Sequence, residues 1–89
     1  MHVVFLVNEN MILTGSVALA RILLAEASTP LNQLVNAPPI SIGAQADDKA
    51  VVDLFHKYNL VVLPVVDEKG RLLGIITADD VLELVVKPK

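Results

Sequence analysis

The chain lacks cysteine and tryptophan altogether, and its aromatic residues are two phenylalanines and one tyrosine. Without cysteine, the protein can form neither a disulfide framework nor a thiolate metal site. Of the 89 residues, 54% are hydrophobic, and most of these are the aliphatic Val, Leu, Ile and Ala that fill the space between sheets and helices. Disordered chains combine low hydrophobicity with high charge, whereas only 19% of these residues are charged. The composition therefore predicts one small folded domain, or part of one.

Basic residues are also few: the chain has seven Lys and Arg residues and ten Asp and Glu residues, so its net charge is -3. Nucleic-acid-binding proteins carry basic surfaces that neutralise phosphates, so we expect no nucleic-acid partner.

Long hydrophobic runs are missing too: the longest, residues 11–25, is interrupted by Gly15 and Arg21, and a spanning helix needs about 20 apolar residues. No basic segment precedes the first valines, which argues against a signal peptide. We expect a soluble chain in the cytoplasm.

An internal repeat is present. A shift of 59 residues lays residues 3–24 over residues 62–83 without a gap. Several positions that are not identical are conservative, such as Asn8 with Asp67, so part of the pattern is kept as well as the identity. The identical pairs are Val3 with Val62, Val7 with Val66, Glu9 with Glu68, Leu13 with Leu72, Gly15 with Gly74 and Leu23 with Leu82.

The second copy opens with a continuous β-branched run at residues 60–66, which predicts a strand buried on both faces. A turn-forming stretch follows, and residues 71–77 predict the returning strand of a hairpin. Thr77 and Asp80 then match the pattern of a helix start, in which a hydroxyl residue caps the helix and an acid follows three residues later. We expect this helix to end by Pro88. In the first copy, the corresponding predictions are strands at residues 3–7 and 12–17 and a helix at 18–27.

Residues 28–39 connect the two copies. Pro30 at a first helical position predicts a short helix at residues 31–35, which residues 36–39 then break. A short strand at 40–42 and an amphipathic helix at 47–58, with Val51, Leu54, Phe55 and Tyr58 on one stripe, complete the second copy. The first copy has no such leading strand and helix, so we expect the chain to be a fragment that begins inside a longer repeat.

A β-α-β-β-α unit of this kind, with residues 63–67, 70–77 and 79–82 in this order, resembles the CBS domain, named for cystathionine β-synthase. The resemblance implies an α/β (α+β) fold in which a first copy truncated to β-β-α packs with the second copy as a pseudo-twofold pair. The expected division is residues 1–27 for the C-terminal part of the first repeat, 28–39 for a linker with a short helix, and 40–87 for the second repeat.

A narrower resemblance covers residues 58–84, with residues 18–35 before them, and points to the cytosolic CBS pair of MgtE-type magnesium transporters. It implies a non-catalytic regulatory domain that senses intracellular magnesium and lies on the cytoplasmic side of an integral inner-membrane protein. Its partners would be a second copy of itself and the rest of a transmembrane transporter. Two alternatives stay open: an adenosyl-nucleotide-binding regulatory module of another protein, and a plain dimerisation module. No catalytic motif is present, and neither His2 nor His56 has a zinc-ligand or nucleophile partner in the sequence, so we expect no enzyme.

Residues 74–80 resemble the nucleotide signature of CBS domains. The resemblance implies that Thr77 and the helix-start amides meet a phosphate, while Asp80 accepts hydrogen bonds from ribose hydroxyls. The same pair is also an ordinary capping box, and this interpretation remains open. In the first copy Ala18 and Arg21 stand at the two positions, so we expect the ribose site to be lost there; Arg21 either faces a phosphate or is solvated. The apolar walls for adenine, which could equally be core, are Ile40, Ile42, Leu63 and Pro64.

Three acids, Asp79, Asp80 and Glu83, cluster at the start of the last predicted helix. Asp79 and Glu83 are four residues apart and therefore neighbours on a helix surface, where like charges repel. Magnesium would relieve this repulsion, since it usually takes one or two carboxylates and keeps its waters. The alternative is a solvated acidic face. Magnesium and an adenine nucleotide are thus the two cofactors to test.

Overall fold

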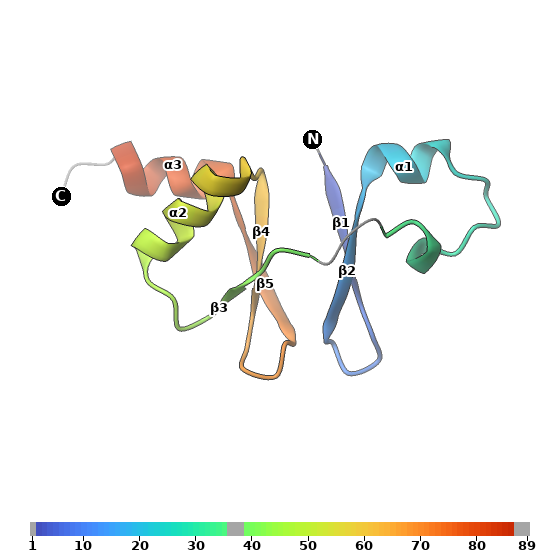
Figure 1. Cartoon of the computed structure of the whole chain (residues 1–89), viewed down its shortest axis with the longest axis horizontal. Helices are drawn as coiled ribbons and strands as arrows, with labels where there is room; N and C mark the ends of the chain where they lie inside the picture. Colours follow the sequence, from blue (N-terminus) through green and yellow to red (C-terminus); the bar gives the residue numbers. More distant parts are fainter. Residues whose placement is uncertain (1, 36–38, 87–89) are drawn as a thin grey trace.

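The computed structural model describes residues 2–35 and 39–86. These residues form a mixed α+β structure with two small sheets that lie side by side in the middle of an elongated molecule of 50 × 28 × 17 Å (Figure 1). Helix α1 lies at one end, and helices α2 and α3 lie together at the other end (Figure 1). The predicted α+β class is therefore confirmed.

The first copy is a hairpin followed by a short helix. Strand β1 (Val3–Val7) pairs antiparallel with β2 (Leu13–Ala18), and α1 (Leu19–Leu24) follows directly. The prediction of a helix over residues 18–27 was too long, because Ala25 is already extended. Most of the α1 surface has nothing to pack against, and Leu24 is 87% exposed, so little tertiary contact stabilises further turns.

The second copy adds a leading strand and a helix to the same plan. Its elements are β3 (Ile42–Gly43), α2 (Asp48–Tyr58), β4 (Val62–Val66), β5 (Leu72–Thr77) and α3 (Ala78–Val86). Strand β3 pairs parallel with β4, which pairs antiparallel with β5. The strand predicted at residues 40–42 lies later in the chain, because the parallel pairing joins Ile42 and Gly43 to Val65 and Val66.

Between the copies, the short helix predicted at residues 31–35 is a 3-10 turn, η1 (Leu31–Gln33). Residues 36–38 of the break predicted at 36–39, and the stop predicted at Pro88, lie outside the described residues.

The core lies between the second sheet and helices α2 and α3. Val51 and Phe55 of the predicted α2 stripe are buried in it, whereas Tyr58 at the end of the stripe is 45% exposed. The Lys57 ammonium lies 5.2 Å from the centre of the Tyr58 ring, which the helix end leaves at the surface. The buried residues of this cluster are Ile42, Val51, Phe55, Leu63 and Val81, and Val17 and Leu34 are buried outside it.

The repeat is visible in the atomic detail of the two hairpin turns. Oδ1 of Asn8 accepts hydrogen bonds from the backbone amides two and four residues later, at 2.8 and 3.1 Å. Oδ1 of Asp67, the equivalent residue, accepts from the same two positions at 2.9 Å each. A register shift interrupts each hairpin at the equivalent point. The two copies therefore share turn chemistry as well as sequence.

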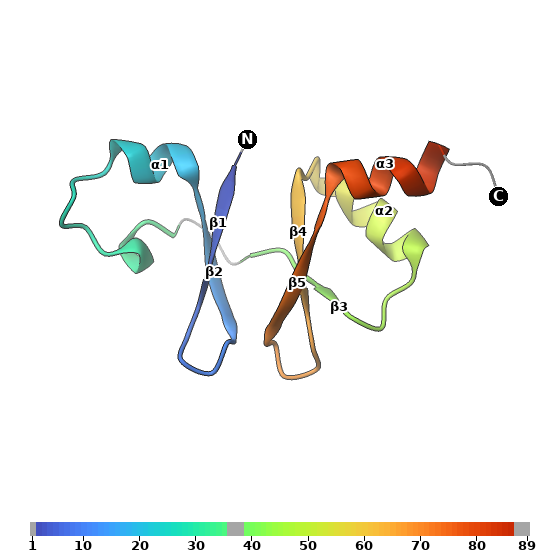
Figure 2. The ribbon, with the colours of Figure 1, turned by 180° about the vertical axis from the view of Figure 1, so that it is seen from behind.

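Two backbone hydrogen bonds join the hairpins across the pseudo-twofold axis. The amide of Leu13 donates to the carbonyl of Gly70 at 3.0 Å, and the amide of the equivalent Leu72 donates to the carbonyl of Met11 at 2.8 Å. Met11 and Gly70 occupy equivalent turn positions with φ of 66° and 83°. The view from behind shows the two hairpins lying next to each other at these turns (Figure 2).

Candidate functional site

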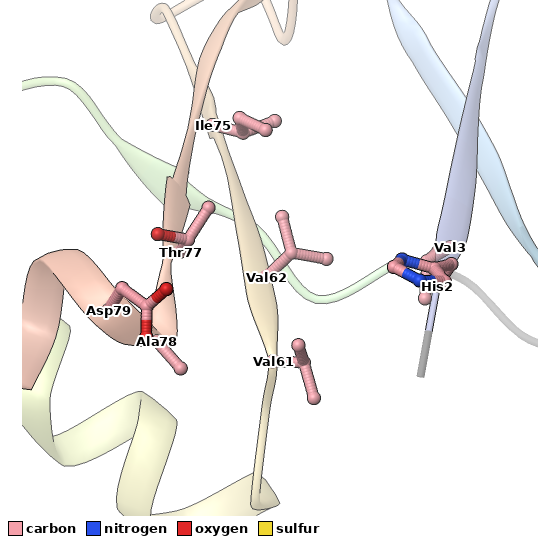
Figure 3. A pocket seen from close by; sticks show the side chains of 8 residues that line it. All are labelled: His2, Val3, Val61, Val62, Ile75, Thr77, Ala78 and Asp79. Atoms are coloured by element: carbon pink, nitrogen blue, oxygen red, sulfur yellow. The ribbon is translucent and has the colours of Figure 1, made fainter.

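A cavity of about 350 Å³ lies between the two copies (Figure 3). This volume falls in the range of sites that hold small organic molecules, and the walls are mainly apolar with a few polar groups, as in such sites. The first copy contributes the start of β1, and the second copy contributes β4, β5 and the start of α3. The lining residues are His2, Val3, Val61, Val62, Ile75, Thr77, Ala78 and Asp79.

The start of α3 is held by a capping box. The Thr77 amide and hydroxyl both donate to Oδ2 of Asp80, at 3.0 and 3.1 Å, and the Asp80 amide donates to the Thr77 hydroxyl at 3.4 Å. The Ala78 amide donates to the carbonyl of Val61 at 2.8 Å. Thr77 lines the cavity, as does the carboxylate-bearing Asp79, whereas Asp80 is engaged in the cap. Since both hydrogen bonds that the Asp80 carboxylate accepts end on Oδ2, Oδ1 is the oxygen that could accept from a ligand.

The four residues predicted as adenine walls divide into two pairs. Ile40 and Pro64 line a second cavity of about 160 Å³, which shares Val3 and Val62 with the first and therefore adjoins it. Ile42 and Leu63 belong to the buried core instead, where Leu63 is 0% exposed. The structure thus brings two of the four to a cavity and leaves the other two behind the wall.

The equivalent helix start in the first copy has a different chemistry. Ala18 is the N-cap of α1 and makes no side-chain cap bond. Nε of Arg21 donates to the backbone carbonyl of Leu34 at 3.0 Å, so this side chain ties α1 to the segment after η1. Arg21 is therefore a structural residue. The sequence carried no signal for this contact, which joins positions 13 residues apart.

The three predicted magnesium ligands, Asp79, Asp80 and Glu83, are all exposed on α3. Across residues 2–35 and 39–86, no three carboxylate or histidine side chains come together in a group that could hold a metal ion.

Of the other acids and histidines, most have structural roles or lie exposed on a helix. Asp47 caps α2 by accepting from the Ala50 amide at 3.0 Å, and Asp53 pairs with Lys49 at 3.1 Å. His56 is exposed on α2. His2 lines the cavity between the copies, a position that the sequence alone did not predict.

An ion pair closes the second hairpin at the end opposite α3. Nε of Arg71 donates to Oδ2 of Asp67 at 2.6 Å. The hydrogen bond from the Arg71 backbone amide is the main cause that holds the pKa of the Asp67 carboxyl below its ordinary value, and the guanidinium adds to it.

Within the parts of the chain that the structure describes, no helix has the length and apolarity to cross a membrane.

Comparison with known proteins identifies relatives for nearly the whole chain. The chain is 35% identical to the magnesium transporter MgtE of Thermus thermophilus and 30% identical to that of Bacillus subtilis, each over 83 residues, which is 93% of this chain and 18% of those proteins. A solved structure of the cytosolic domain of the Mg²⁺ channel MgtE in complex with ATP superposes with a TM-score of 0.87 at 35% identity, covering 92% of this chain and 33% of that one. The chain thus spans less than a fifth of the curated relatives' length. A model of the CBS domain matches residues 31–87, and the chain belongs to the CBS domain family.

Proposed function

We propose that this chain is a regulatory, non-catalytic CBS module of a magnesium transporter and that it responds to intracellular magnesium. The observation that carries the proposal is the 35% identity to a magnesium transporter over 93% of the chain. Because the chain corresponds to 18% of that protein, the transporter, its inner-membrane location and the cytoplasmic position of the module are parts of the proposal.

The acidic start of α3 supplies a mechanism. Asp79, Asp80 and Glu83 are exposed on one short stretch of helix, and the whole chain carries a net charge of -3. When a neighbouring copy or another domain brings its own carboxylates close, the like charges repel and favour separation. Magnesium between the two surfaces would offset this repulsion and favour the compact arrangement. The switch is a shift between two arrangements that magnesium binds with different affinity.

Thermal melts of the chain with added magnesium test this proposal. A ligand that binds only the native form stabilises it by RT ln(1 + [L]/Kd), so magnesium at a few times its Kd should add about 1 kcal/mol. For a domain of this size, 1 kcal/mol corresponds to a rise in Tm of about 4 to 8 °C. Sodium chloride at the same ionic strength should not reproduce the rise, because general screening acts through ionic strength alone.

A pair of double variants makes the test specific. Asp79→Asn with Glu83→Gln should abolish the magnesium effect and raise the baseline Tm, since the repulsion disappears with the charges. Glu9→Gln with Glu68→Gln removes the same net charge from the two hairpin turns, and this control should keep the magnesium effect. An unchanged response in the α3 variant would show that these acids form only a solvated helix start.

A second candidate function is the binding of an adenine nucleotide in the cavity between the copies. Two observations favour it: the cavity has the size and lining of a small-molecule site, and the related MgtE domain was solved in complex with ATP. In this proposal Thr77 and Asp80 hold the ribose and phosphate, and Ile40 and Pro64 contribute to the apolar surface, with Ile42 and Leu63 behind it. Calorimetry should detect weak binding of one nucleotide per chain, which Asp80→Ala should largely remove. No heat with any adenine nucleotide would refute this function and favour a plain dimerisation module.

We also infer that the chain associates with a second copy of itself. Several large apolar side chains of the described residues are more than half exposed, and soluble monomers rarely leave such groups in extended patches. Those that support the inference are Leu23, Leu24, Leu73, Ile75 and Leu82.

A further inference from the structure

A further cavity, of about 380 Å³, lies at the end of the second sheet opposite α3. The loop between β3 and α2 and the turn between β4 and β5 form its walls, and Figure 1 shows both below α2 and α3. Its volume falls in the range of sites that hold small organic molecules, and it shares no residue with the cavity between the copies. The loop contributes Ala44 and the amide-bearing Gln45, and the hairpin contributes Asp67, Glu68, Arg71 and Leu73.

The ion pair at this cavity is not required by the turn that carries it. In the first copy, Oδ1 of Asn8 accepts the same two backbone hydrogen bonds as Oδ1 of Asp67. Ile12 stands there at the position of Arg71, so the turn forms without a carboxylate and without a guanidinium. The second copy adds the bond from Nε of Arg71 to Oδ2 of Asp67, at 2.6 Å. This bond holds the guanidinium at the cavity wall.

Asp67 orients Arg71 and leaves most of its donors available. A guanidinium carries five N–H donors, and the bond to Asp67 uses the single one on Nε. Among the described residues, no hydrogen bond engages the N–H groups of the two Nη atoms. Such paired N–H groups bind a carboxylate in a bidentate manner. Because the Arg71 side chain is 52% exposed, a ligand in the cavity can reach it.

The charges of the wall select against a polyanion. Asp67 and Arg71 neutralise each other, whereas the exposed Glu68 has no basic partner among the described residues. The lining therefore has an excess of one negative charge, which repels a phosphate with its charge of up to about -2. A ligand that offers a carboxylate to Arg71 suits this wall when it also offers a positive group to Glu68. Leu73, which is 59% exposed, and Ala44 supply an apolar part of the wall.

We propose that this cavity binds a small zwitterion of the α-amino acid class with an apolar side chain. Its carboxylate pairs with the guanidinium of Arg71, its ammonium group pairs with Glu68, and its side chain contacts Leu73. The first copy has Ile12 and Thr14 at the positions of Arg71 and Leu73, so one site per chain is expected. This site is separate from the proposed magnesium and nucleotide sites and rests on neither.

Titrations of the 89-residue chain with leucine, N-acetyl-leucine and leucinamide, followed by the amide resonances, test the proposal. N-acetyl-leucine lacks the ammonium group, and leucinamide lacks the carboxylate. An exposed ion pair contributes up to about fivefold in affinity, so leucine should bind about fivefold more tightly than either derivative. The shifts should saturate and should be largest at residues 43–45 and 67–73.

Matched variants assign the two charged contacts. Arg71→Ile reproduces the first copy, whose turn forms with Ile12 at this position, and should lower the affinity for leucine about fivefold without changing that for leucinamide. Glu68→Gln should remove the preference for leucine over N-acetyl-leucine. Glu9→Gln, at the equivalent position of the first turn, should change neither. Equal affinities for the three compounds, shifts that do not saturate, or a leucine affinity that Arg71→Ile leaves unchanged would overturn the proposal.

Discussion

Two equivalent glycines should respond in opposite ways to the same substitution. A Cβ atom added at Gly15 would lie 2.8 Å from Cγ2 and 3.0 Å from Cγ1 of Val35, whereas a Cβ at Gly74 would meet nothing within 4 Å. Valine is stiff at χ1, so its methyl groups cannot both move away without strain. Overpacking of this kind costs about 1 to 3 kcal/mol. Where no clash results, replacing a strand glycine by alanine raises the free energy of unfolding by about 0.5 kcal/mol, because the unfolded chain loses conformational freedom.

We therefore expect Gly15→Ala to lower the free energy of unfolding by about 1 to 2 kcal/mol and Gly74→Ala to raise it by about 0.5 kcal/mol. Urea titration followed by circular dichroism measures both, provided that the slopes of the transitions agree. Val35→Ala in the Gly15→Ala background should restore part of the loss, and the double-mutant cycle gives the coupling directly. Equal effects at the two glycines, or no coupling to Val35, would refute the close packing of the linker on β2.

The remaining predictions concern a turn, an acid and the oligomeric state. Met11→Gly should raise the free energy of unfolding by about 0.5 kcal/mol. The left-handed conformation of Met11 costs a non-glycine residue about 1 to 2 kcal/mol, and the greater chain entropy of glycine in the unfolded state cancels part of the gain from removing this cost. A lower Tm would contradict this prediction. Since folding lowers the pKa of Asp67, its stabilising effect is complete above the ordinary aspartate value of about 3.9 and is lost as the pH falls through the lowered value. Asp67→Asn should therefore flatten the acid limb of a stability–pH curve, and an unchanged limb would count against the ion pair. Sedimentation at micromolar concentration should give a dimer, and a monomer would contradict association through the exposed leucines.

Much of the fold could be predicted from the sequence because its determinants are local. Asn8 and Asp67 specify their turns by bonds to amides within four residues, and continuous apolar runs predict the first strand of each hairpin. The capping box of Thr77 and Asp80 is local in the same sense. The length of α1 was not predictable, since a helix of this size depends on contacts that its sequence does not contain.

What the sequence could not supply depends on how the two copies dock. The bonds that join Leu13 and Leu72 to the opposite turns exist only in the paired arrangement, and the cavity that includes His2 forms at the same interface. Extending the repeat overlay by one residue would have placed His2 over Val61 and shown that the two copies carry different side chains at this position. The division of the predicted adenine walls was also hidden, because core strands and binding walls have the same aliphatic composition.

The central claim, that magnesium acts on the acidic start of α3, is tested most directly by nuclear magnetic resonance. Amide resonances of the 89-residue chain would be followed during titration with magnesium chloride, with sodium chloride at equal ionic strength as the reference. We expect saturable shifts that are largest for Asp79, Asp80 and Glu83 and small at the hairpin turns that contain Glu9 and Glu68. Shifts that do not saturate, or that sodium reproduces, would contradict it.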